Sequence, residues 1–165
     1  RATPMRWAMM AYVKAKMGST QSFLTEWPTP PKPEISKPSG WLLAAPMCAA
    51  EGLWDAAEAY ANAGAAAGDV PQPLLLLGET ALQTRQIIKA QDYLQRATQA
   101  YPDSPTPWLY LSELAFAQKD PSSAKRLLAE AEKRGASENS LKPRRERLES
   151  GAKEGQESGV GTIMR

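Results

Sequence analysis

The 165-residue chain contains no histidine, and this absence excludes several kinds of active site. Without an imidazole there is no Ser–His or Cys–His nucleophile pair, and the most common metal-ligating side chain is missing. A single cysteine, Cys48, excludes an internal disulfide and a zinc site built from several cysteines. We therefore expect a protein that is not an enzyme and that binds no cofactor and no metal.

Two further absences concern membranes and nucleic acids. No run of 18 apolar residues is present, so no transmembrane helix is predicted. The 20 Lys and Arg nearly balance the 18 Asp and Glu. The basic stretch 142–148 also carries Glu146 and lacks an aromatic residue, which indicates a charged capping helix and no nucleic-acid binding.

The chain begins at Arg1 and not at methionine. This start indicates that a targeting segment, a larger precursor or a tag has been removed. This reasoning does not identify the compartment. Removal of a targeting segment would fit import into an organelle or export.

Only two phenylalanines are present, and the prolines are unevenly placed, which marks the domain boundaries. The apolar residues are mostly alanine and leucine, a composition that predicts closely packed helices. We expect an N-terminal helical arm over residues 1–27 and, because of five prolines, an extended linker over 28–40. Helical hairpins are then predicted over 41–138, a C-terminal capping helix over 139–150 and a flexible tail over 151–165.

When the sequence is shifted along itself by one fixed interval, it matches without a gap. The shift aligns Leu74 with Trp108 and, in the other direction, with Gly40. The middle copy has Leu74, Leu77, Gly78, Ala81, Ala90, Leu94, Ala97 and Pro102. The following copy has Trp108, Leu111, Ser112, Ala115, Ala124, Leu128, Ala131 and Ala136. The preceding copy has Gly40, Leu43, Ala44, Met47, Ala56, Tyr60, Ala63 and Gly68. Small residues thus recur where two antiparallel helices would approach each other most closely.

This pattern resembles the tetratricopeptide repeat, a helix–turn–helix unit of about 34 residues, in three tandem copies over residues 37–138. The resemblance implies an all-α fold, a right-handed superhelical stack of antiparallel helix pairs (an α-solenoid). The four consecutive leucines 74–77 would then be helical and buried on two faces. The first copy departs from the pattern, because it has Gly40 where a tryptophan is usual and Trp41 one place later.

By the same resemblance, the first helices of the hairpins would line a concave groove. The predicted groove-facing residues are Trp41, Ala45, Cys48, Ala49, Leu75, Glu79, Leu82, Gln83, Leu109, Glu113, Phe116 and Ala117. This largely apolar surface with two acidic residues suits an apolar segment that carries lysine or arginine. Either a partner or another part of this chain is expected to fill it.

The N-terminal helix is a candidate docking element, because it combines a methionine and aromatic stripe with basic residues. Its candidate residues are Arg6, Trp7, Met9, Tyr12 and Lys16. Three interpretations compete: a packing cap on the first hairpin, a docking helix for another subunit, and a helix that lies on a membrane surface.

The sequence therefore predicts a non-enzymatic scaffold or adaptor whose partners are other proteins. The alternative is a structural accessory subunit that is permanently built into a larger, membrane-associated complex. These two classes share a fold and differ in whether the partner exchanges.

Overall fold

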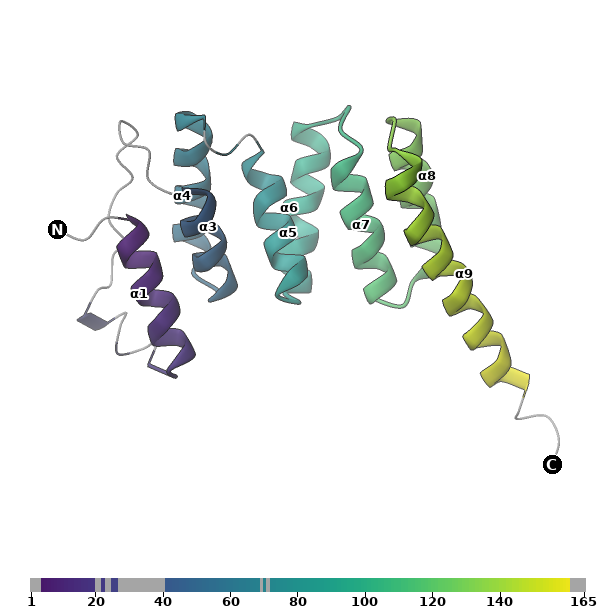
Figure 1. Ribbon diagram of the computed structural model, residues 1–165, viewed down its shortest axis with the longest axis horizontal. Helices are drawn as coiled ribbons and strands as arrows, with labels where there is room; N and C mark the ends of the chain where they lie inside the picture. Colours follow the sequence, from purple (N-terminus) through teal and green to yellow (C-terminus); the bar gives the residue numbers. More distant parts are fainter. Residues whose placement is uncertain are drawn as a thin grey trace. The chain divides into compact units, whose positions relative to one another are not determined.

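The computed structural model describes residues 4–19, 22, 25–26, 41–68, 70 and 72–160. The predicted linker over 28–40 and the last five residues of the predicted tail lie outside the described residues. The described elements are α1 (Pro4–Lys16), α3 (Trp41–Ala50), α4 (Trp54–Ala67), α5 (Pro73–Gln83), α6 (Ile87–Ala100), α7 (Thr106–Ala117), α8 (Pro121–Lys133) and α9 (Glu138–Val160) (Figure 1).

The described part of the chain is helical throughout, without a strand, and its neighbouring helices pack as in a tetratricopeptide-like stack. This confirms the predicted fold class. None of these helices is both long enough and apolar enough to span a bilayer. The chain forms two compact units, Arg1–Tyr93 (unit 1) and Leu94–Arg165 (unit 2), so that α6 begins in one and ends in the other.

Prolines and an aspartate mark where the later helices begin. Pro73, Pro107 and Pro121 occupy the first turns of α5, α7 and α8, where a missing N–H costs no helical hydrogen bond. Asp120 caps α8, because its side chain accepts a hydrogen bond from the backbone N–H of Ser123 at 3.0 Å. These local signals fix the helix starts, and packing decides which faces become buried.

The same turn joins the two helices of each hairpin. In each case one residue has a positive φ, and its N–H and the next N–H donate to the carbonyls three and five residues earlier. The positive-φ residues are Gly52 (78°), Arg85 (58°) and Lys119 (62°). The step from Gly52 to Arg85 is therefore one residue shorter than the step from Arg85 to Lys119.

The predicted gap-free alignment of the first hairpin is wrong, because its turn is displaced by one residue from the place that the alignment gives it. Trp41, and not Gly40, is then equivalent to Leu74 and Trp108. On the second helix, Ala57 replaces Ala56 as the equivalent of Ala90. This correction removes the departure noted at the start of the first copy.

Small side chains form the interior of unit 1. Ala44, Ala45, Ala49, Ala57 and Ala61 are fully buried, so α3 and α4 approach each other closely. Large side chains fill the remaining space, and among them Tyr60, Leu77 and Tyr93 are at most 2% exposed.

The four-leucine run is helical as predicted, but its burial differs from the prediction. Leu77 is buried, whereas Leu74, Leu75 and Leu76 are only partly buried. Four consecutive residues cover most of the circumference of a helix, at about 100° each, so they cannot all face the same neighbour.

Unit 2 has its own core on α7, α8 and α9. It contains Leu109, Ala115, Ala124, Leu128, Ala131, Leu141 and Leu148, with Trp108, Phe116, Leu127 and Ala136 packed against it. The burial of Ala124, like that of Ala90, is as the repeat pattern predicts. Helix α9 contributes Leu141 and Leu148, and its backbone continues past the predicted end at residue 150 to Val160.

Candidate functional site

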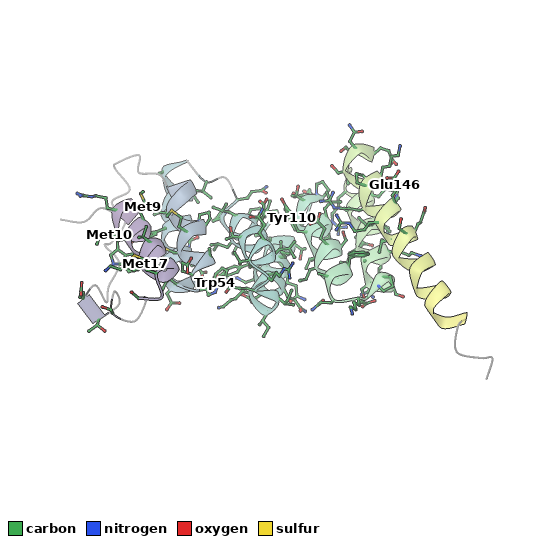
Figure 2. The ribbon with its side chains drawn as sticks, turned by 60° about the horizontal axis from the view of Figure 1, so that its bottom comes forward. Met9, Met10, Met17, Trp54, Tyr110 and Glu146 are labelled. Carbon is green, nitrogen blue, oxygen red and sulfur yellow. The ribbon has the colours of Figure 1, made fainter. Side chains whose placement is uncertain are left out.

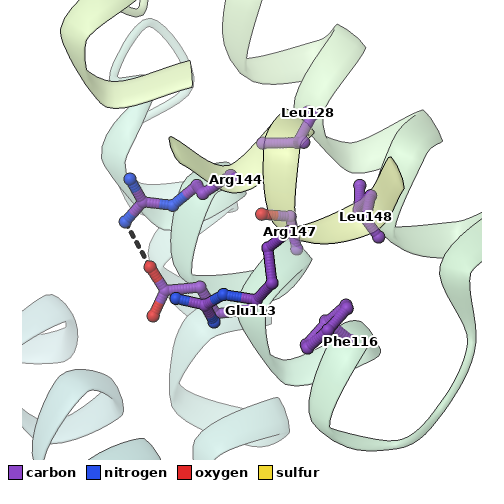
Figure 3. Close-up of a pocket in the computed structure, with 7 residues that line it drawn as sticks. Glu113, Phe116, Leu128, Arg144, Arg147 and Leu148 are labelled. Atoms are coloured by element: carbon purple, nitrogen blue, oxygen red, sulfur yellow. Dashed lines mark hydrogen bonds and ion pairs between the residues drawn. The ribbon is translucent and has the colours of Figure 1, made fainter. Parts of the chain in front are cut away.

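An ion pair joins Glu113 on α7 to Arg144 on α9 at a small surface pocket of unit 2 (Figure 3). Both side chains are about a quarter exposed. The Arg144 guanidinium is held in place because its Nη1 also donates to the carbonyl of Ser140 at 2.7 Å, one helical turn earlier. This charge-assisted pair joins two elements that are 31 residues apart in the chain.

Two further α9 residues complete the contact. The Arg147 guanidinium lies 5.4 Å from the centre of the Phe116 ring, a cation–π distance, and Leu148 is buried in the unit 2 core. The cavity that remains beside these residues has a volume of about 10 Å³, enough for about one water molecule. Helix α9 therefore covers this part of α7.

The predicted groove residues of α7 are more covered than those of α5. On α7, Leu109 is buried, while Glu113 and Phe116 are contacted by α9. On α5, Leu75, Glu79 and Leu82 are partly exposed. Glu79 accepts a hydrogen bond from Gln83 Nε2 of its own helix at 3.3 Å.

The groove-facing residues predicted on α3 do not lie on a surface. Cys48 is 1% exposed, and Ala45 and Ala49 are fully buried. The one-residue shift explains the burial of Cys48 and Ala45, because they become equivalent to the buried residues Ala81 and Gly78. Ala49, in contrast, is buried although it is equivalent to the partly exposed Leu82. Burial raises the pKa of the Cys48 thiol to about 12, so the thiol stays protonated and behaves as a small core side chain. The side chain of Trp41 lies outside the described residues.

The N-terminal helix α1 packs against α3, the arrangement that the packing-cap interpretation expects. Trp7 is 2% exposed, whereas Arg6 and Met9 are exposed. The side chains of Tyr12 and Lys16 lie outside the described residues. The predicted docking residues are thus divided between a buried face and an exposed one.

Sequence reasoning missed the contribution of α9 to this site. The basic stretch 142–148 was predicted to be a solvated cap, but Arg144, Arg147 and Leu148 recur at helical spacing and face α7 and α8. That spacing of two arginines and a leucine was the available signal. It could indicate one contacting face, though not which helix the face would contact.

Comparison with known families identifies the repeat. A family model described as "Tetratricopeptide repeat" matches residues 81–141, from the end of α5 to the beginning of α9. Residues 81–141 form a tetratricopeptide-repeat segment. The matched repeat segment includes Glu113 and Phe116 and the whole α7–α8 hairpin. Comparisons with curated proteins and with solved structures gave no match.

Proposed function

We propose that the chain is a non-enzymatic scaffold that binds another protein through the exposed surface of its helical hairpins. Tetratricopeptide repeats generally mediate protein–protein interactions, and their stacked first helices present the binding surface.

The α3–α4 hairpin belongs to the same array in this proposal, so that residues 41–138 form three repeats. Support comes from its turn, which has the positive φ and the two backbone hydrogen bonds of the later hairpins. Its first helix supplies Pro46 and Ala49 at the places of Glu79 and Leu82. The charge available for a partner is therefore on α5.

The proposed binding surface in unit 1 is the α5 face, which consists of Leu75, Glu79 and Leu82. One observation carries this assignment: at the equivalent positions of the next repeat, Glu113 pairs with Arg144 and Phe116 lies against Arg147. The chain thus shows how an acidic and an apolar residue at these places hold a basic amphipathic helix. The α5 face would accept a helical segment with the same order of basic and apolar residues.

Leucine burial would contribute more affinity than charge on this face. Exposed ion pairs contribute at most about 1 kcal/mol. Covering the exposed parts of Leu75 and Leu82 would contribute about 2 kcal/mol in total, because each is already partly buried. Glu79 would chiefly select basic partners and fix their register.

The test is capture of partners from the native source with matched variants of α5. We expect Leu82→Lys to lose the captured protein and Glu79→Lys to weaken it, because each places a cation against a basic segment. Gln91→Lys is the control, since Gln91 is exposed on α6, outside the α5 face. Circular dichroism must show the same helix content for all variants, so that loss of binding is not loss of fold.

Identical capture by Leu82→Lys and Gln91→Lys would overturn the α5 face as the binding surface. The captured protein also distinguishes the two functional classes. A partner that exchanges with added free chain indicates an adaptor, whereas a stoichiometric partner that does not exchange indicates an accessory subunit.

A further inference from the structure

Helix α1 exposes four large apolar side chains on one stripe (Figure 2). Met9 is 50% exposed, Met10 39%, Val13 52% and Met17 69%. Met17 continues the helical turn, because its N–H donates to the carbonyl of Val13 at 3.1 Å. We name these four residues the α1 stripe. Among the described residues, the other large apolar side chain of comparable exposure is Ile88 on α6.

A different face of α1 holds the helix against unit 1. Trp7 and Ala11 are each 2% exposed, and α1 packs against α3. At about 100° per residue, the centre of the α1 stripe lies roughly 120° around the helix from these two residues. Packing on α3 therefore orients the helix and leaves the stripe uncovered.

The charges that accompany the stripe all have one sign. The segment 1–25 contains Arg1, Arg6, Lys14 and Lys16 and no acidic residue, because the first carboxylate of the chain is Glu26. All 18 acidic residues lie from Glu26 onward, where they outnumber the remaining basic ones, so net positive charge is concentrated at α1. An apolar surface with negative charge would therefore complement the stripe.

We propose that the α1 stripe binds the surface of a lipid bilayer that contains anionic lipids. The four apolar side chains would enter the boundary between headgroups and acyl chains, and the basic residues would attract anionic headgroups. Methionine suits this role because its unbranched side chain adapts to a fluid environment. The proposal goes beyond protein binding, since it places the scaffold on a membrane surface.

The observations favour a bilayer over an acidic groove of a protein. The stripe lies on a single helix, and three of its four residues are methionines, whose flexible side chains present no fixed shape. Protein grooves obtain specificity from complementary charges at fixed positions and from a fixed shape. Binding to a bilayer surface requires neither fixed charge positions nor a fixed shape.

The first experiment is co-sedimentation of the full chain with vesicles. We expect binding to vesicles of phosphatidylcholine with phosphatidylserine and little binding to phosphatidylcholine alone. Replacing Arg6, Lys14 and Lys16 by glutamine should weaken binding about 100-fold, because each cation near an anionic surface contributes about five-fold. Met9→Gln with Met17→Gln should weaken it about 30-fold, through loss of apolar burial.

Two sets of matched controls accompany these variants. Ile88→Gln removes an apolar side chain that is 84% exposed on α6, and should bind as the parent does. Replacing Lys125, Arg126 and Lys142 by glutamine removes three exposed cations of unit 2, and should also leave binding unchanged. If the α1 variants fail to fold, the parent chain still provides a test, because added salt should release it from the vesicles.

A second experiment measures insertion of the stripe directly. In a Cys48→Ala background, Met10→Cys carrying an environment-sensitive fluorophore should show a blue-shifted emission when anionic vesicles are added. The control label at Gln91→Cys, an exposed position on α6, should not respond.

Three results of the vesicle experiments would overturn the proposal. These are equal binding to neutral and anionic vesicles, no binding to either, and a label at position 10 that does not respond to bound vesicles. Self-association of the parent that is lost in the Met9→Gln, Met17→Gln variant would identify a second copy as the occupant and would equally overturn it.

Discussion

The indole nitrogen of Trp54 donates a hydrogen bond to Gln86 Oε1 at 3.0 Å, across 32 residues of sequence. The same amide donates from Nε2 to the carbonyl of Ala49, at the end of α3, also at 3.0 Å. That carbonyl belongs to the last turn of α3 and also accepts the Gly52 N–H at 3.0 Å, so it receives two hydrogen bonds. One side chain in the α5–α6 turn thus connects that turn to both helices of the preceding hairpin.

Gln86→Ala should therefore destabilise unit 1 by about 2 kcal/mol, because two partly buried hydrogen bonds are lost. Gln86→Glu keeps the acceptor for Trp54 but turns a carboxylate oxygen toward the Ala49 carbonyl, which is also an acceptor, so a loss at least as large is expected. Unfolding in guanidinium, followed by circular dichroism, measures both. Gln83→Ala is the control on exposed α5 surface, and an equal midpoint for Gln86→Ala would contradict the role of the amide.

Substitution of a buried alanine tests the close approach of α7 and α8. Ala124 is 1% exposed, so Ala124→Trp should overpack the hairpin and cost about 1–3 kcal/mol or more. Ala129→Trp makes the same change at an exposed position of α8 and should have little effect. Thermal unfolding compares the two variants, and similar melting curves would show that α8 does not pack as described.

The contact between α7 and α9 can be measured with a double-mutant cycle of Glu113→Ala and Arg144→Ala. We expect a coupling free energy of about 1 kcal/mol, because the pair is partly shielded and hydrogen-bonded. Arg145 and Glu138, 3.3 Å apart and more exposed, form the comparison pair and should couple weakly. Equal coupling in the two cycles would mean that Glu113 does not hold α9.

The cap of α8 should make unit 2 sensitive to acid. Hydrogen bonds from the Ser123 side chain and backbone lower the pKa of Asp120 below its ordinary value of 3.8. A lowered folded-state pKa means that the stabilisation is complete above about pH 4 and is lost as the pH falls through the folded-state pKa. Melting temperatures across this range should show a pH-dependent difference between the parent and Asp120→Ala.

Asp120→Asn separates charge from capping in the same experiment. Asparagine keeps a side-chain acceptor for the Ser123 N–H but cannot titrate, so its contribution should not change with pH. If the parent and Asp120→Asn lose stability in parallel on acidification, other carboxylates cause the loss.

The helical hairpins could be predicted from the sequence, because small residues recur at fixed spacing and prolines mark the helix starts. The register of the first hairpin could not be predicted from the sequence. Ala44 and Ala45, like Ala56 and Ala57, are adjacent alanines, so two alignments that differ by one position fit the pattern almost equally well. Only the turn at Gly52 shows which alignment is correct.

The contacts of α9 also could not be predicted from the sequence. The spacing of Arg144, Arg147 and Leu148 defines one face of a helix, but the pairing with Glu113 depends on where the chain places that face in space. Local patterns specify which side of a helix differs from the rest. They do not specify which helix or residue that side contacts.

Most of the described buried residues of α3 and α4 are alanines, and this has a mechanical consequence. Methyl groups form only shallow ridges, so they resist a small sliding displacement less than interlocked leucines do. A molecule that pressed on α3 would therefore meet a more compliant element than a leucine-packed helix.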